Sequence, residues 1–247
     1  KLIDLDDRRL NVVDVGRGSP LVLVHGFPLD HSMWSGQIDE LSVDFRVIAP
    51  DLRGFGRSTG GVGERLTMDQ LADDIAALLD VLQIDEPVTY CGLSMGGYIG
   101  WQFFRRHRDR LGKLIQCDTK SRADTDEARE TRLKAASLVL RQGVGPLVST
   151  MLPKLFSEAT VQNQPHLVEA TRPVMEATLP QTVAASQRGM AARPDVTSML
   201  GVIEVPALVL CGEQDTISPP DEMRSIAEAI PRAQYVEIAG AGHMAPL

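Results

Sequence analysis

The sequence is poor in cysteine and aromatic residues, and it has no long apolar run. Its three cysteines, Cys91, Cys117 and Cys211, are too few for a disulfide framework and lie in or beside apolar segments, so we expect buried, unreactive thiols. Histidines and cysteines nowhere have the spacing of metal ligands, and we expect no metal ion or organic cofactor. No apolar run approaches the roughly 20 residues of a membrane span, and no signal peptide is apparent, so we expect a cytoplasmic protein.

Positive charge is scarce as well. The chain has 25 lysines and arginines against 33 aspartates and glutamates, which gives a net charge of -8. Such an acidic protein is not expected to have a dedicated surface for nucleic acid or for an anionic membrane. Because 43% of the 247 residues are hydrophobic, we expect a core large enough to shape a small-molecule site. The sequence does not indicate the oligomeric state.

What the chain does contain is an alternation of short apolar strands and longer helices. We predict helices at residues 68–82, 98–104 and 222–229, and strands at residues 10–15, 20–24, 45–49, 87–91, 114–117, 207–211 and 234–238. Continuous apolar strands are buried on both faces, and their alternation with helices indicates an α/β protein with a doubly wound, mostly parallel sheet.

Residues 121–194 interrupt this alternation. They contain helical patterns, such as residues 129–140 and 144–155, and no convincing strand. We predict that residues 1–120 and 195–247 form the core and that residues 121–194 form an inserted helical lid. Helices packed on the edge of the core, without a lid function, are the alternative.

The segment from Gly92 to Gly96 carries the most informative motif. It reads G-x-S-x-G, with Ser94 at its centre, and it lies between a predicted strand and a predicted helix. A tight turn in this context exposes a serine hydroxyl to a base, and the free N–H groups of the following helix, including that of Met95, face the developing oxyanion. This context favours a nucleophilic Ser94 over a glycine-rich turn with a solvated serine.

A base is expected at the end of another strand, because the carboxyl ends of parallel strands meet at one edge of the sheet. Among the five histidines, only His243 follows a predicted strand in a glycine-rich loop that could aim it. His107 lies among arginines at a helix end, His166 lies in the lid, and His31 is expected at the surface or the entrance. We therefore predict His243 as the general base.

The acid that orients this base is expected after the strand at residues 207–211. Asp215 is the candidate, since it would hold the imidazole tautomer and stabilise the imidazolium. Glu213, in the same loop, and Asp118, at the end of the preceding strand, are the alternatives. The order serine, aspartate, histidine is also the order found in α/β hydrolases.

The loop after the strand at residues 20–24 supplies the second oxyanion donor in this interpretation. We predict the backbone N–H of Phe27, paired with that of Met95. His25 is expected to tie loops together rather than to act as a base. Arg53 and Arg57 are expected to brace a glycine-rich loop by pairing, with a role in substrate binding as the alternative.

Together these segments resemble the α/β-hydrolase superfamily over nearly the whole chain. The matching residues are 24–28, 51–58, 92–97, 212–215 and 240–243. Residues 91–97 look most like those of bacterial 3-oxoadipate enol-lactonases and small carboxylesterases. Members of the superfamily usually carry a further helix after the catalytic histidine, so we expect the chain to continue beyond Leu247. Haloalkane dehalogenases and epoxide hydrolases resemble this fold too, but they have aspartate in place of Ser94.

The resemblance and the residues imply hydrolysis of a carboxylic ester or lactone through an acyl-enzyme on Ser94. A carbon–carbon bond hydrolase, a cofactor-free perhydrolase, a lyase on the same triad, and a weakly catalytic ligand receptor are the alternatives. Apolar residues of the lid could line the pocket for such a substrate, although ordinary helix packing is the other interpretation; they are Met151, Leu152, Leu155, Phe156 and Met175.

Overall fold

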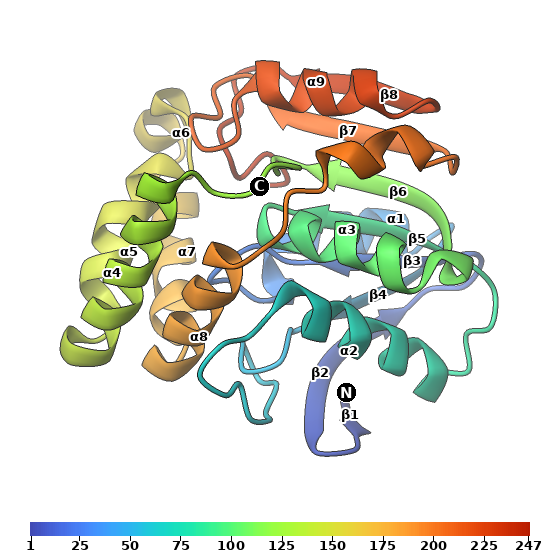
Figure 1. Ribbon diagram of the computed structural model, residues 1–247, viewed down its shortest axis with the longest axis horizontal. Helices are drawn as coiled ribbons and strands as arrows, with labels where there is room; N and C mark the ends of the chain where they lie inside the picture. Colours follow the sequence, from blue (N-terminus) through green and yellow to red (C-terminus); the bar gives the residue numbers. More distant parts are fainter.

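A sheet of eight strands forms the centre of the computed structural model, which describes residues 1–247 (Figure 1). Its order is β1-β2-β4-β3-β5-β6-β7-β8; β1, β2 and β4 pair antiparallel, and all later pairs are parallel. The strands are β1 (Leu2–Leu5), β2 (Arg8–Val15), β3 (Pro20–Val24), β4 (Arg46–Pro50), β5 (Val88–Leu93), β6 (Leu111–Cys117), β7 (Ala207–Gly212) and β8 (Ala233–Ile238).

The mostly parallel sheet confirms the predicted fold class. The seven predicted strands correspond to β2 through β8, whereas β1, at the edge of the sheet, lies outside the prediction. All five residues of β3 are buried, because helices cover both faces of the sheet at this position.

Helices α2 (Met68–Val81), α3 (Met95–Arg106) and α9 (Pro220–Ala229) cover one face of the sheet, and α1 (Ser35–Leu41) lies on the other (Figure 1). α2 begins with a capping box, in which Thr67 and Gln70 satisfy each other's backbone N–H groups. Its buried stripe, at helical spacing, includes Leu71, Ile75, Leu78 and Leu79. α1 buries only Ile38 and lies outside the predicted helices.

Between β6 and β7 the chain forms a block of helices, which we call the insertion (residues 121–194). The block lies beyond the carboxyl ends of the parallel strands (Figure 1). The chain then returns through the short helix η4 (Thr197–Val202) to β7. The helices of the insertion are α4 (Asp126–Gln142), α5 (Gly145–Met151), η3 (Leu152–Lys154), α6 (Glu158–Asn163), α7 (Pro165–Glu176) and α8 (Pro180–Ala191).

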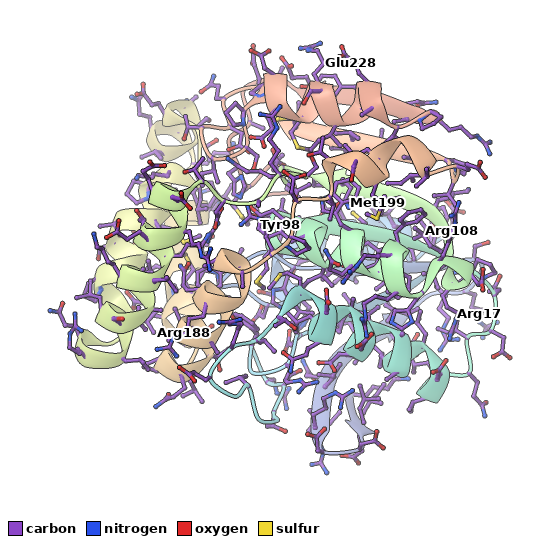
Figure 2. All side chains as sticks on the ribbon, viewed as in Figure 1. Arg17, Tyr98, Arg108, Arg188, Met199 and Glu228 are labelled. Carbon is purple, nitrogen blue, oxygen red and sulfur yellow. The ribbon has the colours of Figure 1, made fainter.

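The two ends of the insertion meet at a neck. The N–H of Val196 donates to the carbonyl of Ser121 at 2.9 Å, and the buried Arg193 pairs with Asp124 at 2.7 Å. The Arg193 guanidinium also lies 4.2 Å above the centre of the Tyr98 ring, near the start of α3 (Figure 2). The segments that leave and re-enter the core are therefore joined to each other and to α3.

The three cysteines are buried and free, which confirms the expectation from the sequence. The sulfur atoms of Cys91 and Cys117 lie 3.9 Å apart on neighbouring strands, and this contact and burial raise the pKa of Cys117. Burial also raises the pKa of Cys211. The thiols of Cys117 and Cys211 are therefore protonated and unreactive at neutral pH. No helix of the structure combines the length and apolar character that crossing a membrane requires.

Candidate active site

Ser94 occupies the tight turn between β5 and α3. Its backbone has φ of 53° and ψ of -108°, a region that residues with a side chain rarely adopt. The Ser94 N–H donates to the carbonyl of Cys117 at 2.9 Å, and its carbonyl accepts from the Thr119 hydroxyl at 2.8 Å. Both backbone groups of the strained residue are thus held by the end of β6, and the side chain remains partly exposed.

The glycines of the G-x-S-x-G motif are required by close backbone contacts. A Cβ atom on Gly92 would collide with the carbonyl of Gly96, and one on Gly96 would collide with the carbonyl of Val24. The second contact places the start of α3 directly against the end of β3. These two glycines therefore allow the turn to close and bring α3 next to the loop that follows β3.

His243 and Asp215 form a buried hydrogen-bonded pair. His243 Nδ1 lies 2.8 Å from Asp215 Oδ2, and both side chains are almost completely buried. The other oxygen of Asp215 accepts the N–H groups of Ile217 at 2.7 Å and Ser218 at 3.1 Å. With Asp215 as acceptor, Nδ1 carries the proton and Nε2 is left to accept one. His243 and Ser94 make no direct hydrogen bond, as is common in unliganded sites.

The two alternative acids lie elsewhere in the hydrogen-bond network. Glu213 is exposed and accepts the N–H of Gly240 at 2.7 Å. Asp118 is buried and accepts the N–H of Gly212 at 2.8 Å. Neither is hydrogen-bonded to His243, so the structure pairs the histidine with Asp215 among the three candidates.

The loop that carries His243 is fixed on two sides. On the core side, the N–H of Gln214 donates to Ala241 at 2.8 Å. On the other side, the N–H of Met244 donates to the carbonyl of Leu155 in the insertion at 2.9 Å. A Cβ atom on Gly242 would lie only 2.6 Å from the N atom of Ser157, so the insertion packs directly on this loop.

Two residues near Ser94 in the fold have a backbone N–H group available to a ligand. Phe27 follows β3, and its N–H makes no backbone hydrogen bond. The neighbouring Gly26 is so close that a Cβ atom on it would lie 3.6 Å from the Cβ of Ser94. Met95 is the first residue of α3, where an N–H has no acceptor within the helix. The arrangement can thus offer two donors to an oxygen atom bound next to Ser94.

His25 ties two loops together, as predicted. It is fully buried, its Nδ1–H donates to the carbonyl of Gly26 at 2.8 Å, and its Nε2 accepts the N–H of Leu52 at 2.9 Å. Burial lowers the pKa of His25, which is therefore neutral. Arg53 braces its loop through Asp74, with Nε at 2.8 Å from a carboxylate oxygen.

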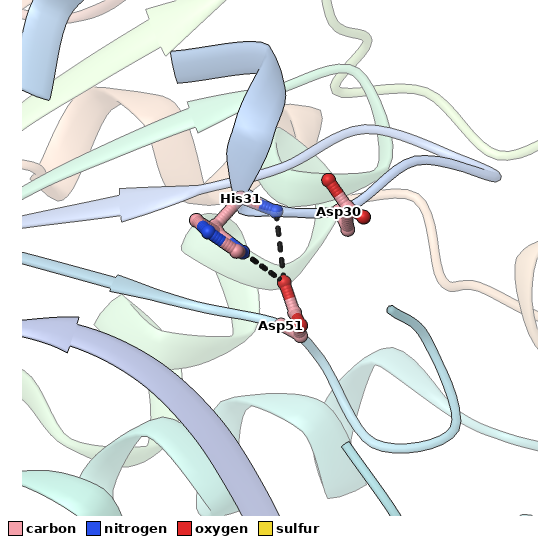
Figure 3. Close-up of side chains that lie close together, drawn as sticks. All are labelled: Asp30, His31 and Asp51. Carbon is pink, nitrogen blue, oxygen red and sulfur yellow. Dashed lines mark hydrogen bonds and ion pairs between the residues drawn. The ribbon is translucent and has the colours of Figure 1, made fainter. Parts of the chain in front are cut away.

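The remaining histidines belong to other contacts. His31 is half-buried, and both its backbone N–H, at 3.0 Å, and its Nδ1, at 2.5 Å, contact Oδ1 of Asp51 (Figure 3). This hydrogen bond raises the pKa of His31. Burial raises the pKa of Asp51, but the hydrogen bond from His31 and those from other donors outweigh this effect and hold the pKa well below its usual range. His107 pairs with Asp73 at 2.8 Å.

Two clusters have the donor types of a metal site. One joins His31 and Asp51 with Asp30 (Figure 3), and the other consists of Asp118, Asp215 and His243. In each cluster a histidine nitrogen is already hydrogen-bonded to a carboxylate. In both clusters a hydrogen bond between the histidine and the carboxylate therefore accounts for their short distance without a metal ion.

The predicted pocket residues divide into two groups. Met151 lines a cavity of about 500 Å³ between the insertion and the acid-bearing loop, together with Arg132, Gln187 and Ile217. Phe156 lines a second cavity of about 470 Å³ that also borders Asp215. Three others are buried in the hydrophobic core and line neither cavity; they are Leu152, Leu155 and Met175. Arg132, Gln187 and Ile217 carry no motif in the sequence that would mark them as cavity residues.

Comparison with known proteins gives the same fold. A family model described as the alpha/beta hydrolase fold matches residues 19–247, and the chain belongs to this family. The solved structure of a thermophilic esterase from Thermogutta terrifontis, with malate bound, is 44% identical; the match covers 100% of this chain and 92% of that one, with a TM-score of 0.97. The enol-lactonase from Burkholderia xenovorans LB400 is 31% identical, with coverage of 100% and 94% and a TM-score of 0.92. A 3-oxoadipate enol-lactonase of Acinetobacter baylyi is 30% identical over 96% of this chain and 87% of its own length.

Proposed function

We propose that the protein is a serine hydrolase that cleaves carboxylic esters or lactones through an acyl-enzyme on Ser94. One observation carries the proposal. A strained serine, and a buried pair in which His243 Nδ1 lies 2.8 Å from Asp215 Oδ2, are both placed on loops that follow the carboxyl ends of the parallel strands. The similarity to an esterase and to enol-lactonases supports an ester or lactone as the substrate class.

The reaction begins with attack by Ser94 Oγ on the substrate carbonyl carbon. The hydroxyl proton passes to Nε2 of His243, and the resulting imidazolium is stabilised by Asp215. The negative charge that develops on the carbonyl oxygen is stabilised by the N–H groups of Phe27 and Met95. Two backbone donors suit this role, because helix α3 and the loop after β3 hold them in place before the substrate arrives.

The tetrahedral intermediate then collapses. The bond from carbon to the leaving oxygen breaks, and His243 returns its proton to the departing alkoxide or enolate. Water attacks the acyl-enzyme with His243 again as base, which releases the carboxylic acid and restores Ser94. In a lactone the leaving oxygen stays attached to the acyl group, so a single product carries both the new carboxylic acid and the released hydroxyl or enol group.

The insertion is proposed to cover this site as a lid. It lies over the carboxyl ends of the strands, and the cavity lined by Met151 and Ile217 opens between it and the acid-bearing loop. Met151 and Ile217 give this cavity apolar lining, and Arg132 and Gln187 give it polar lining. In this proposal the insertion offers side chains of both kinds next to the loop that carries Asp215.

Replacement of the nucleophile tests the proposal. Ser94→Ala is expected to reduce hydrolysis of p-nitrophenyl acetate, butyrate and octanoate and of an enol-lactone by on the order of 10³-fold or more, because the residual rate comes only from binding and oxyanion stabilisation. Ser225→Ala, at an exposed serine of α9, serves as the matched control and should retain the parent rate.

Mass spectrometry of the quenched reaction separates the remaining mechanisms. An acyl group trapped on the peptide that contains Ser94 supports the acyl-enzyme, and products formed without the addition of water indicate a lyase-type reaction on the same residues. Equal turnover by the parent and by Ser94→Ala would contradict the proposal.

A further inference from the structure

Asp118 has an unusual backbone for a residue with a side chain. It directly follows β6, its N–H donates to the carbonyl of Leu210 at 3.0 Å, and its φ is 46°. Its exposed fraction is 0%. A positive φ at a buried, charged residue type requires support from the surroundings, and such outliers are concentrated at functional sites.

The Asp118 carboxyl group has one satisfied and one unsatisfied oxygen. Oδ1 accepts the N–H of Gly212 at 2.8 Å. Oδ2 is fully buried and has no hydrogen-bond partner. An ionised carboxylate can only accept hydrogen bonds, so a buried oxygen without a donor carries a large desolvation cost. A proton on Oδ2 removes the charge and turns this oxygen into a donor.

An acceptor for that proton lies close by. Asp118 and Asp215 each have a carboxylate oxygen, and His243 a ring nitrogen, that lie within 4.8 Å of one another. Asp215 accepts the His243 Nδ1–H and two backbone N–H groups, so it is the acceptor of the two carboxyl groups. Two carboxyl groups at such a distance in a buried site do not both ionise. Asp118 is the one with fewer donors, and it is therefore the one that holds the proton.

The other groups around Asp118 do not provide a compensating positive charge. Burial, opposed by the Gly212 N–H and reinforced by the Asp215 charge, raises the pKa of Asp118 to about 8. From β6 and β7 it is faced by the thiols of Cys117 and Cys211, which are neutral. On the side of α1, the cavity that Asp118 lines is bordered by uncharged residues, including Trp34, Gln37 and Leu41.

We propose that Asp118 is a positioning residue: a neutral carboxylic acid whose Oδ2–H donates to the Asp215 carboxylate and holds it in place for His243. This inference rests on the proposed function, because it assigns Asp118 to the same Ser94, His243 and Asp215 site. Asp118 touches no substrate; it acts by fixing the acceptor of the His243 Nδ1–H. When Asp118 ionises at alkaline pH, the donor is lost and a second negative charge appears beside Asp215.

Two substitutions at one position separate the hydrogen bond from the charge. Asp118→Asn keeps a donor for Asp215 and an acceptor for Gly212, but it cannot ionise. Asp118→Ala removes both the donor to Asp215 and the acceptor for the Gly212 N–H. Asp221→Asn, which removes one exposed negative charge at the start of α9, is the matched control.

Steady-state kinetics on p-nitrophenyl butyrate give the first readout. Asp118→Asn should keep kcat within about threefold of the parent at pH 7, and Asp118→Ala should lower kcat by roughly tenfold or more with little change in KM, since a hydrogen bond to a charged group is lost. The parent should lose kcat as the pH rises through about 8, and Asp118→Asn should not. Asp221→Asn should follow the parent.

A second readout needs no substrate, so it remains decisive if the ester or lactone proposal fails. The proton NMR signal of His243 Nδ1–H should be retained in Asp118→Asn and shifted or broadened in Asp118→Ala. Infrared difference spectra between the parent and Asp118→Asn should contain the carbonyl stretch of a protonated carboxylic acid at pH 7, and this band should disappear above pH 9.

Several results would overturn the inference. A loss of kcat in Asp118→Asn as large as that in Asp118→Ala would mean that the site needs an ionised Asp118. If Asp118→Ala keeps the kcat of the parent, or if the His243 Nδ1–H signal is unchanged in that variant, Asp118 does not position Asp215. If Asp118→Ala does not fold, the absence of the infrared band in the parent, or an alkaline loss of kcat that persists in Asp118→Asn, would overturn it equally.

Discussion

Three histidines near the carboxyl ends of the strands make different hydrogen bonds with their ring nitrogens, because the groups that face them differ. His25 is buried between a carbonyl and an N–H group, which requires a neutral ring with one donor and one acceptor. His31 faces the Asp51 carboxylate and gains affinity for a second proton. His243 also faces a carboxylate, but Asp215 is already held by two N–H groups. The local acceptor, and not the residue type, decides which histidine can act as a base.

The contact between His31 and Asp51 predicts a pH-dependent contribution to stability. The pKa of His31 is raised by folding, so its contribution is fully present below the unfolded value of about 6.5 and is lost as the pH rises through the higher folded value. His31→Ala should therefore lower the free energy of unfolding by about 1–2 kcal/mol at pH 5.5, at the low end for a hydrogen bond to a charged group because the His31 side chain is partly exposed. Thermal melts at pH 5.5 and pH 9 measure the difference.

The matched control is His166→Ala, because His166 is exposed on α7. That variant should melt within about one degree of the parent at both pH values, as surface substitutions usually do. A stability loss in His31→Ala that stays constant or increases toward pH 9 would show that packing, and not the charged hydrogen bond, accounts for the effect.

At the level of elements, the site depends on how closely α3 approaches β3 and β5. The start of α3 is in backbone contact with the end of β3 through Gly96, and with β5 through Gly92. This contact fixes the distance between the two candidate oxyanion donors, since Phe27 follows β3 and Met95 begins α3. The geometry of the donor pair is thus a property of two packed elements.

A methyl group at this contact tests its importance. Gly96→Ala should lower kcat by at least tenfold and the free energy of unfolding by about 1–3 kcal/mol, the usual cost of overpacking. Gly36→Ala is the control, because Gly36 lies in α1 and an added methyl group there would have no atom within 4 Å. That substitution should be neutral or slightly stabilising, as alanine favours a helix. Parent activity in Gly96→Ala would refute the close-contact argument.

The elements that the sequence predicts well are those in which burial determines the pattern. The continuous apolar runs of β3 and β7 and the stripe of α2 give their positions to within a few residues. α1 escapes prediction because it has a glycine in its first turn and buries only Ile38. β1 escapes because a four-residue edge strand has too short a pattern. Local sequence specifies an element only where one face of it is consistently buried.

The candidate site follows a similar rule. Ser94, Asp215 and His243 could be selected because each follows a predicted strand, and strand ends meet at one edge. The same rule also selects Asp118, but it does not reveal which oxygen is unpaired or that Asp215 lies beside it. The pocket residues are the least predictable, because an apolar residue such as Leu152 looks the same in sequence whether it lines a cavity or packs in a core.

At the level of the whole molecule, the insertion is in direct contact with the loops that carry the candidate site. The segment from Leu155 to Ser157 packs on the loop of His243 through one backbone hydrogen bond and the close approach at Gly242. The position of the candidate base therefore depends on the insertion, which lies far earlier in the chain, as well as on β8.

Gly242→Ala tests this dependence. The added methyl group would lie 2.6 Å from the N atom of Ser157, so the His243 loop and the insertion have to separate. We expect kcat to fall by about tenfold or more, with a loss of about 1–3 kcal/mol of stability from overpacking. Gly201→Ala, in η4, is the control, since the nearest atom to its added methyl is 4.0 Å away. If Gly242→Ala has the same kcat as the parent, the insertion does not position the base.

The neck of the insertion also bears on how such a protein diversifies. The chain leaves the core near Ser121 and re-enters it near Val196, and a backbone hydrogen bond of 2.9 Å joins these two points. The helices in between can consequently change in length, number or composition while the ends that the core has to accommodate stay where they are. Changes in these helices can therefore accumulate apart from the sheet, except at the segment from Leu155 to Ser157, which contacts the His243 loop, and at buried residues such as Leu152 that belong to the hydrophobic core.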